Sequence, residues 1–404
     1  MVSIPLPALA GTYLRIGALG FGGPQAHLAL LQNEIVERRG WVAADRFDEG
    51  LGLCEALPGP ASSQMAIYLG CCSHGRAGGL LSGLCFLTPG LLLVLLLSAL
   101  WRQGQGVMLL QLPLALLQPV VAAIVWRFAW TQLQRRDAPW QRATTLLVAA
   151  ATLLNHAGVL PAPAGLLLLL AGLARAIRPD HGLSGLIPLP LLTMGCKPLL
   201  ASLTGPGIGL AIPGLFAELF LLFFKAGLLI FGGGLVLIPL LRDAVVAQGW
   251  VDAAGFLDGV AIGQLTPGPV VLTSAFVGYQ AGWQEGGPVL AISSALWATV
   301  AIFLPSFLLV LIAAPWLERW RRLIPVQAFL AGVLAGVPGL LLAAALPITL
   351  GSLQGSAAWD CLLRGAVLVA ALAAGRRLQP AQLLLVALLT GLLPSLVMAW
   401  PELG

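Results

Sequence analysis

Charged residues are scarce in this chain of 404 residues: Asp, Glu, Lys and Arg make up 9% of it, whereas 59% of the residues are hydrophobic. The mean hydropathy is +0.94. A water-soluble domain carries roughly 25% charged residues, so a soluble globular protein is excluded. Apolar runs recur from end to end, each near the ~20 residues that a helix needs to cross a hydrocarbon core of roughly 30 Å. The sequence therefore predicts an all-α polytopic membrane protein.

Motifs that mark other classes of protein are also missing. There is no HExxH metal motif, no GxSxG elbow and no Walker sequence, which leaves an intramembrane enzyme as a distant alternative. The four histidines are scattered and the six cysteines lack zinc-type CxxC spacing, so we expect no metal site and no cofactor. Basic patches interleaved with aromatic residues are absent, which argues against a nucleic-acid partner. No basic stretch precedes the first apolar segment, which itself carries Arg15, so we do not interpret it as a signal peptide.

What the chain does contain is an internal duplication. The first copy reads Arg15-Ile-Gly-Ala-Leu-Gly-Phe-Gly-Gly-Pro24 and later Ala56-Leu-Pro-Gly-Pro60; the second reads Lys225-Ala-Gly-Leu-Leu-Ile-Phe-Gly-Gly-Gly234 and later Leu265-Thr-Pro-Gly-Pro269. Arg15 and Lys225 lie 210 positions apart, and Pro58 and Pro267 lie 209 apart. We therefore predict two membrane repeats, residues 1–178 and 213–404, joined by a linker at 179–212.

The positions of the basic residues favour an odd number of crossings in each repeat. In the first half they cluster after the first apolar segment, after the fourth and near the linker: Arg38, Arg39, Arg46, Arg135, Arg136, Arg142, Arg175, Arg178 and Lys197. All of these clusters become cytoplasmic, as the positive-inside rule requires, if the segment holding Pro-Gly-Pro enters and leaves on one face. Each repeat then has five crossings plus a broken, re-entrant segment, and the copies are inverted relative to one another.

The Pro-Gly-Pro segments are suited to such a break, because proline removes a donor and glycine frees the backbone dihedrals. Non-helical backbone at membrane depth survives only where protein or a water-filled cavity satisfies it. The alternative is that each proline only kinks a full crossing helix, which would give six crossings per half and parallel repeats.

Two basic residues within apolar segments point to anion transport. A charged side chain near the bilayer centre costs about 3 kcal/mol even on lenient scales, so Arg15 and Lys225 are candidates for a functional role. Pseudo-symmetry would bring them toward one another, where together they could offset the two charges of a dianion. The alternatives are that either side chain extends to an interface, or that Lys225 pairs with Glu218.

Glycines and prolines at the breaks supply the second element of the expected anion site. Glycine exposes backbone N–H groups, and a half-helix that begins after a break presents its N-terminal amides to an anion. The substrate-binding candidates at the breaks are Gly22, Gly23, Pro24, His27, Pro58, Gly59, Pro60, Gly232, Gly233, Gly234, Pro267, Gly268 and Pro269. Close helix packing is the alternative role for such glycines.

The sequence indicates less clearly which residue couples transport to a source of energy. Glu55 lies three residues before Pro58 in an apolar setting, and its counterpart by register is the uncharged Gln264. A buried carboxyl there would hold its proton tightly, so Glu55 is the candidate for proton coupling; the alternative is a structural partner for an arginine. His27 could donate to the anion or relay a proton, or could face a neighbouring helix.

These motifs resemble the paired signatures of the chromate transporter family. The resemblance rests on Gly20-Phe-Gly-Gly-Pro-Gln-Ala-His27 with Glu55-Ala-Leu-Pro-Gly-Pro60, and on Phe231-Gly-Gly-Gly234 with Gln264-Leu-Thr-Pro-Gly-Pro269. It implies a secondary active transporter in the bacterial inner membrane that exports chromate, driven by the membrane potential or the proton gradient, and confers chromate resistance. Sulfate is the chemically similar competitor. A transporter or channel for sulfate or another inorganic anion stays open, as does a homodimer within the membrane lipid.

Overall fold

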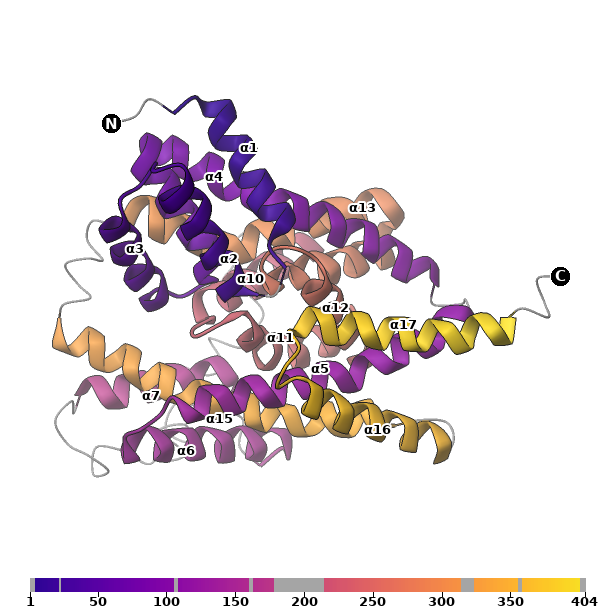
Figure 1. Ribbon diagram of the computed structural model, residues 1–404. Helices are drawn as coiled ribbons and strands as arrows, with labels where there is room; N and C mark the ends of the chain where they lie inside the picture. The colour runs from indigo at the N-terminus through magenta and orange to yellow at the C-terminus, as the bar shows by residue number, and fades with distance from the viewer. Residues whose placement is uncertain are drawn as a thin grey trace.

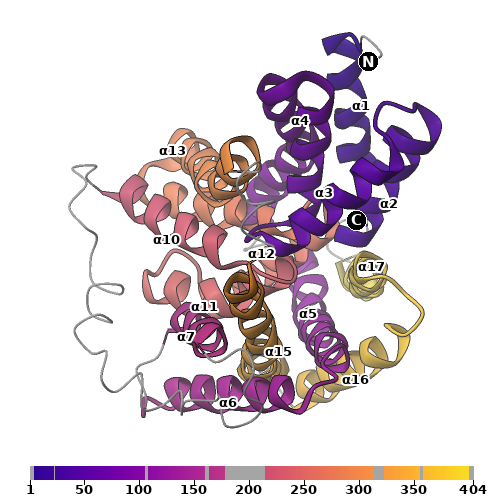
Figure 2. The same cartoon turned by 90° about the vertical axis from the view of Figure 1, so that its left-hand side faces the viewer.

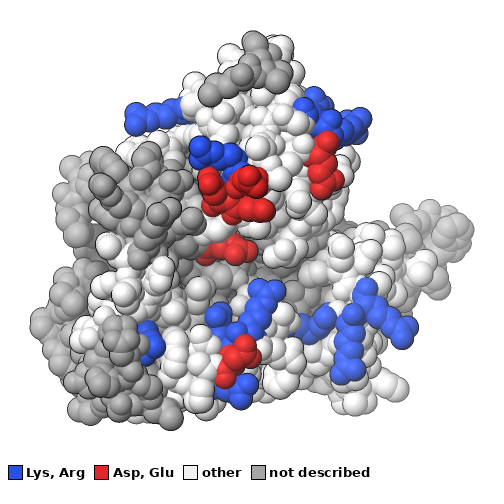
Figure 3. Space-filling view, turned by 60° about the vertical axis from the view of Figure 1, so that its left-hand side comes forward, with Lys and Arg blue, Asp and Glu red and all other residues white. Residues whose placement is uncertain are grey.

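The computed structural model describes residues 4–21, 23–104, 108–159, 163–177, 214–313, 323–354 and 358–399. These residues form helices and no strand (Figure 1), as the sequence predicts. The predicted linker at 179–212 lies outside the described residues, as does Gly22. Many large apolar side chains are exposed, Val289 and Leu92 among them, which suits a surface facing lipid. Figure 3 shows a surface that is largely free of charge, with Lys, Arg, Asp and Glu standing in a few groups.

In the first repeat, the described residues form seven α-helices and one π-helix. In chain order they are α1 (Leu6–Leu19), α2 (Pro24–Leu31), η1 (Gln32–Arg38), α3 (Ala44–Ala56), α4 (Ala61–Gly104), α5 (Met108–Gln134), α6 (Pro139–His156) and α7 (Ala164–Ile177). Prolines start α2 and α6, where a missing N–H costs no helical hydrogen bond.

The second repeat follows the same order. Its elements are α10 (Leu215–Leu229), η3 (Gly234–Val236), α11 (Leu237–Ala247), α12 (Ala253–Leu265), η4 (Val270–Leu272), α13 (Thr273–Leu308), η5 (Leu309–Ala313), α15 (Ile324–Leu353), α16 (Ala358–Ala374) and α17 (Pro380–Ala399). The break between α1 and α2 recurs between α10 and η3, and the Pro-Gly-Pro break before α4 recurs before η4.

The longest helix of each repeat is a tight hairpin. In α4 the backbone leaves helical geometry at His74 and Gly75, and the hydroxyl of Ser82 donates to the carbonyl oxygen of Ala66 at 2.8 Å. Residues that far apart would be separated by about 24 Å in a straight helix, so residues 61–73 and 76–104 run antiparallel. In α13 the corresponding bend lies at Gly286 and Gly287.

The two repeats interlock, and their equivalent parts run in opposite directions. A Cβ at Gly79 would lie 2.8 Å from the Leu311 side chain, and one at Gly83 would lie 2.7 Å from the Phe307 ring. As the residue number increases along α4, the residue number of its contact in η5 and α13 decreases. These segments are therefore antiparallel, as expected for inverted repeats. The last helices of each repeat cross over: α6 and α7 pack on α15, and α16 and α17 pack on α5 (Figures 1 and 2).

The first apolar segment of the chain is not one continuous helix. It is divided into α1, which ends at Leu19, and α2, which begins at Pro24, and the two helices run in different directions (Figures 1 and 2). The 14 residues of α1 extend about 21 Å, less than a hydrocarbon core. Within the described ranges, four helices are long and apolar enough to cross a membrane, namely α4, α5, α13 and α15. The number of ten crossings stays a prediction.

Candidate functional site

Four breaks interrupt the helices: a first break after the first helix of each repeat, and a second break at each Pro-Gly-Pro motif. The Pro-Gly-Pro break of each repeat contacts the first break of the other repeat. The backbone N–H of Gly59 donates to the carbonyl oxygen of Ile230 at 2.7 Å, and that of Gly268 donates to the carbonyl oxygen of Gly20 at 3.0 Å. These two hydrogen bonds are equivalent by register, because Gly20 and Ile230 each end the first helix of a repeat. Each Pro-Gly-Pro break therefore lies against the first break of the other repeat.

Local chemistry explains why glycine stands at the centre of each Pro-Gly-Pro motif. Gly59 has φ 124° and Gly268 has φ 105°, both in the left-handed region that side chains rarely adopt. The flanking prolines have no N–H, so the glycine carries the only backbone donor of the motif. That donor satisfies a carbonyl at the end of α1 or α10, where a helix leaves its last carbonyls without intrahelical partners.

The first breaks are braced by different side chains in the two repeats. In the first repeat, the buried His27 donates from Nε2 to the carbonyl oxygen of Gly20 at 2.7 Å, and its ring meets Phe86 edge-on at 5.4 Å. In the second, Gln132 of α5 donates to the carbonyl oxygen of Gly232 at 3.0 Å. The contacts of His27 fit the alternative in which this histidine faces a neighbouring helix.

Polar side chains also hold the Pro-Gly-Pro breaks in place. Gln64 donates from Nε2 to the carbonyl oxygen of Pro58 at 2.6 Å and to the hydroxyl of Ser306 at 3.3 Å. The hydroxyl of Ser63 donates to Pro60 at 2.9 Å, and that of Thr273 donates to Val270 at 2.8 Å. Each break is thus fixed from its own helix, and Gln64 also reaches the other repeat.

Hydrogen-bond donors gather next to these breaks. Helix α4 begins at Ala61 directly after Pro60, and η4 begins at Val270 directly after Pro269, so two sets of N-terminal amides start here. Within the described parts of the chain, the hydroxyls of Ser62 and Ser274 are buried and have no hydrogen-bond partner. Amides at a helix N-terminus together with hydroxyl groups can take the place of water around an anion.

The glycines of the first breaks have the backbone that only glycine adopts easily. Gly23, Gly232 and Gly233 have φ 86°, 74° and 136°. Pro24 is the first residue of α2, and Gly234 opens η3. A Cβ on Gly233 would lie 2.7 Å from the ring of Phe128, so α5 approaches this break closely.

The predicted charged residues have exposed side chains. Arg15 and Lys225 have exposed side chains on α1 and α10, about one to two turns before each break. Glu55 is exposed near the end of α3, whereas its neighbour Cys54 is buried, so the expected burial of this carboxyl is not found. The roles of these three residues stay predictions.

One buried acid was missed in the sequence. Asp258 on α12 has only 5% of its surface exposed and accepts hydrogen bonds from Trp101 Nε1 at 3.0 Å and Gln118 Nε2 at 3.4 Å. A signal was present, because Asp258 is a charged residue inside an apolar segment. The described residues hold no group of three or more His, Cys, Asp or Glu able to bind a metal ion.

Comparison with known proteins gives one consistent family. The family model described as "Chromate transporter" matches residues 7–176 and 217–392, which fall in the two repeats. A probable chromate transport protein of Synechococcus elongatus is 32% identical over 343 residues, covering 83% of this chain and 82% of the relative. The chromate transport protein of Pseudomonas aeruginosa is 34% identical over 351 residues, covering 83% and 79%. That of Cupriavidus metallidurans is 30% identical over 335 residues, covering 81% and 78%. No solved structure matches.

Proposed function

The chain belongs to the chromate transporter family, and from that premise we propose that it carries chromate across the bacterial inner membrane as a secondary active exporter. Export driven by the membrane potential or the proton gradient would confer chromate resistance. The family and the apolar helices make the chain a multi-pass membrane transporter rather than an enzyme. Chromate is the proposed substrate because these relatives are named chromate transport proteins. Sulfate is the competing anion, since it has the same tetrahedral shape and charge.

The observation that carries this proposal is the crossing of the four breaks. A tetrahedral dianion must exchange its hydration shell for donors before it enters a medium of low dielectric constant. The N-termini that follow Pro60 and Pro269, with the hydroxyls of Ser62 and Ser274, provide such donors. Their positive dipole ends favour negative charge. The substrate therefore binds at the Pro-Gly-Pro breaks, in line with the midplane sites of transporters built from broken helices.

The positive charge for the dianion comes from Arg15 and Lys225 in this proposal. Both lie before a break on equivalent helices, and their side chains are exposed. Arg15 offers a planar fork that can contact two oxygens at once, whereas Lys225 offers a point charge. The two residues guide the anion toward the breaks and offset its charge on the way.

The crossed hydrogen bonds supply an element that can change between two access states. Gly59 binds Ile230 and Gly268 binds Gly20, so a movement of one repeat relative to the other alters both contacts. The pseudo-symmetry of the pairs allows one to loosen as the other tightens. Access to the breaks then alternates between the two sides of the membrane.

Chromate uptake into everted membrane vesicles tests the proposal. Vesicles from cells with and without the chain are compared, with excess sulfate as competitor and with the proton gradient collapsed in a parallel sample. Uptake that depends on the chain, is inhibited by sulfate and falls with the gradient supports an energised oxyanion exporter. Uptake without countertransport would favour a channel, and absence of uptake in well-inserted protein would exclude chromate and turn the search to sulfate or another inorganic anion.

A further inference from the structure

Asp258 is a buried carboxyl between the two repeats. It lies on α12 of the second repeat, while both of its hydrogen-bond donors belong to the first: Trp101 on α4 and Gln118 on α5. Both donors are neutral. Within the described residues no Lys, Arg or His forms an ion pair with it. A carboxyl in this setting has no basic group in direct contact with it.

Burial of an ionised carboxylate without a basic partner is energetically unfavourable unless the carboxylate takes up a proton. Two neutral N–H donors stabilise a carboxylate only in part, and burial of an unpaired charge costs several kcal/mol in general. The charged groups that act on Asp258 are Asp252, at the start of its own helix, and Arg364 on α16. The elements α4 and α5 present neutral side chains to it. An ionisable residue at membrane depth that faces the protein interior is by default a functional candidate.

The register of the repeats makes the burial of Asp258 specific to the second copy. The residue 209 positions earlier is Glu49, which is exposed and forms a salt bridge with Arg46 at 3.0 Å. The two copies thus keep an acid at the same place, but only the second buries it away from a basic partner. Helix packing alone does not require this, because the first copy packs its equivalent helix with the acid at the surface.

The position on α12 links the carboxyl to the candidate anion site. The helix runs from Ala253 to Leu265 and leads directly into Pro267-Gly268-Pro269. From Asp258 to the end of the helix is about 10 Å along a rigid element. A movement of α12 against the first repeat would therefore alter both the contact between Gly268 and Gly20 and the contacts of Asp258 with Trp101 and Gln118.

We propose that Asp258 is the proton-carrying residue of this transporter, and this rests on the proposed function. In one access state the carboxylate takes a proton from water on one side and becomes a neutral acid; in the other it releases that proton to the opposite side. One proton enters as one anion leaves, and no covalent bond other than that to the proton forms or breaks. Conformation and protonation are coupled because the hydrogen bonds of the carboxyl differ between the two states.

The test separates exchange from net transport with Asp258→Asn, which keeps the shape and an acceptor oxygen but cannot carry the proton. Everted vesicles preloaded with chromate report exchange against labelled chromate, and empty vesicles report uptake driven by a proton gradient. We expect exchange close to that of the unmodified chain. Stimulation by the gradient should fall by about tenfold or more, the scale of a typical coupling between sites. Glu49→Gln, at the equivalent position of the first repeat, is the matched control and keeps the stimulation.

A second measurement uses the unmodified chain, in case Asp258→Asn inserts poorly. A hydrophobic carbodiimide reacts with protonated buried carboxyls, and peptide mass spectrometry locates the adduct. We expect modification at Asp258 that decreases at alkaline pH and changes when chromate is added. Unmodified Asp258 at acidic pH, or gradient-driven uptake that Asp258→Asn leaves intact, would overturn the inference. Absence of chromate uptake by the unmodified chain would instead overturn the proposed function.

Discussion

The backbone N–H of Gly59 hydrogen-bonds the carbonyl oxygen of Ile230 at 2.7 Å, so a break in the first repeat caps the end of α10 in the second. The reverse contact, from Gly268 to Gly20, caps α1. Backbone groups that a membrane cannot satisfy are thus satisfied by the other repeat. The breaks are therefore held by the whole molecule rather than by either repeat alone.

Gly59→Ala should lower chromate transport by about tenfold or more, the scale of a contact worth some 1.4 kcal/mol. Its φ of 124° is strained for any side chain, and the new Cβ would meet Ser306 Oγ and Gln64 Nε2. Uptake into everted vesicles, normalised to inserted protein, is the measurement. Gly365→Ala is the control, because this helical glycine has no atom within 4 Å of the Cβ position. Equal uptake by the two variants would assign Gly59 to packing.

The sequence was sufficient for the repeats and their breaks because each signal is local. A basic residue, a Phe-Gly-Gly motif and a Pro-Gly-Pro motif can be located without knowledge of the fold. The pairing of Gly59 with Ile230 could not be predicted, because it depends on which surfaces meet after folding. The same holds for Glu55 and Cys54, adjacent residues of α3 whose exposure is decided by the helix face that packs.

Gln132→Leu should impair transport while the protein still reaches the membrane. Its amide donates to the carbonyl oxygen of Gly232, and its loss leaves that carbonyl without this donor, a change that costs about 1–3 kcal/mol for a buried group. The exposed Gln134 on the same helix provides the control as Gln134→Leu. Transport rates and the amount of inserted protein are measured together. Identical transport rates in both variants would mean that transport does not depend on the hydrogen bond from Gln132 to Gly232.

Gly17→Ala should lower the thermal stability of the purified protein by about 1–3 kcal/mol. A Cβ at Gly17 would collide with the backbone of Phe86 on α4, and the equivalent Gly227 meets the backbone of Ile302 on α13. Gly11→Ala, on the same helix with open space around it, should be neutral or stabilising because alanine favours helix. Thermal unfolding in detergent compares the two. A stable Gly17→Ala would show that α1 can shift away from α4.

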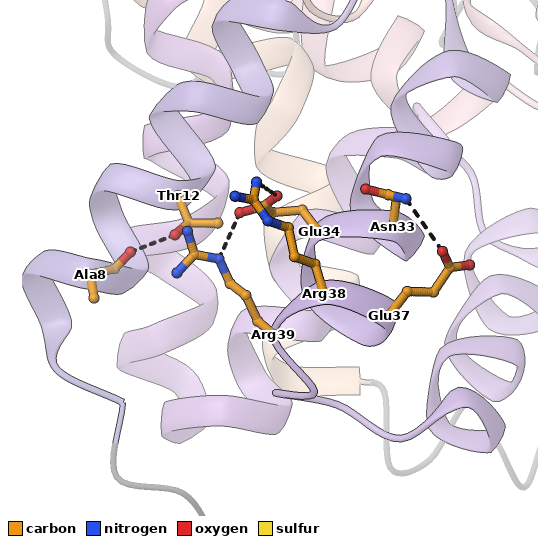
Figure 4. A network of polar contacts seen from close by, with 7 residues as sticks. All are labelled: Ala8, Thr12, Asn33, Glu34, Glu37, Arg38 and Arg39. Atoms are coloured by element: carbon orange, nitrogen blue, oxygen red, sulfur yellow. Dashed lines mark hydrogen bonds and ion pairs between the residues drawn. The ribbon is translucent and has the colours of Figure 1, made fainter.

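Glu34 should make the stability of the protein depend on acidic pH. Arg39 donates to it at 2.7 Å and Arg38 at 3.1 Å (Figure 4). Burial raises the pKa of Glu34, but the hydrogen bonds from Arg39 and Arg38 outweigh burial and lower it overall. A lowered pKa contributes stability that is complete above the unfolded value, about 4.3, and is lost as pH falls through the folded value.

The corresponding measurement is the unfolding midpoint as a function of pH for the unmodified chain and for Glu34→Gln. The unmodified chain should lose stability below about pH 4.3 more steeply than the variant. Glu37→Gln is the control, since Glu37 is exposed and meets only Asn33 at 3.3 Å among the contacts in Figure 4. Parallel curves for the unmodified chain and Glu34→Gln would assign the acid sensitivity to other carboxyls.

Arg15→Gln and Lys225→Gln should each lower chromate uptake by about tenfold or more while insertion into the membrane is unchanged. Both side chains are exposed, so their removal leaves the packing of α1 and α10 intact. A dianion that approaches the breaks then meets only one positive charge, and its transfer from water is less well offset. Arg15→Lys should restore part of the uptake, because it returns the charge without the planar fork. Arg135→Gln, another exposed cation, is the control. Full uptake by either glutamine variant would remove that residue from the anion path and leave the helix N-termini at the breaks to offset the charge.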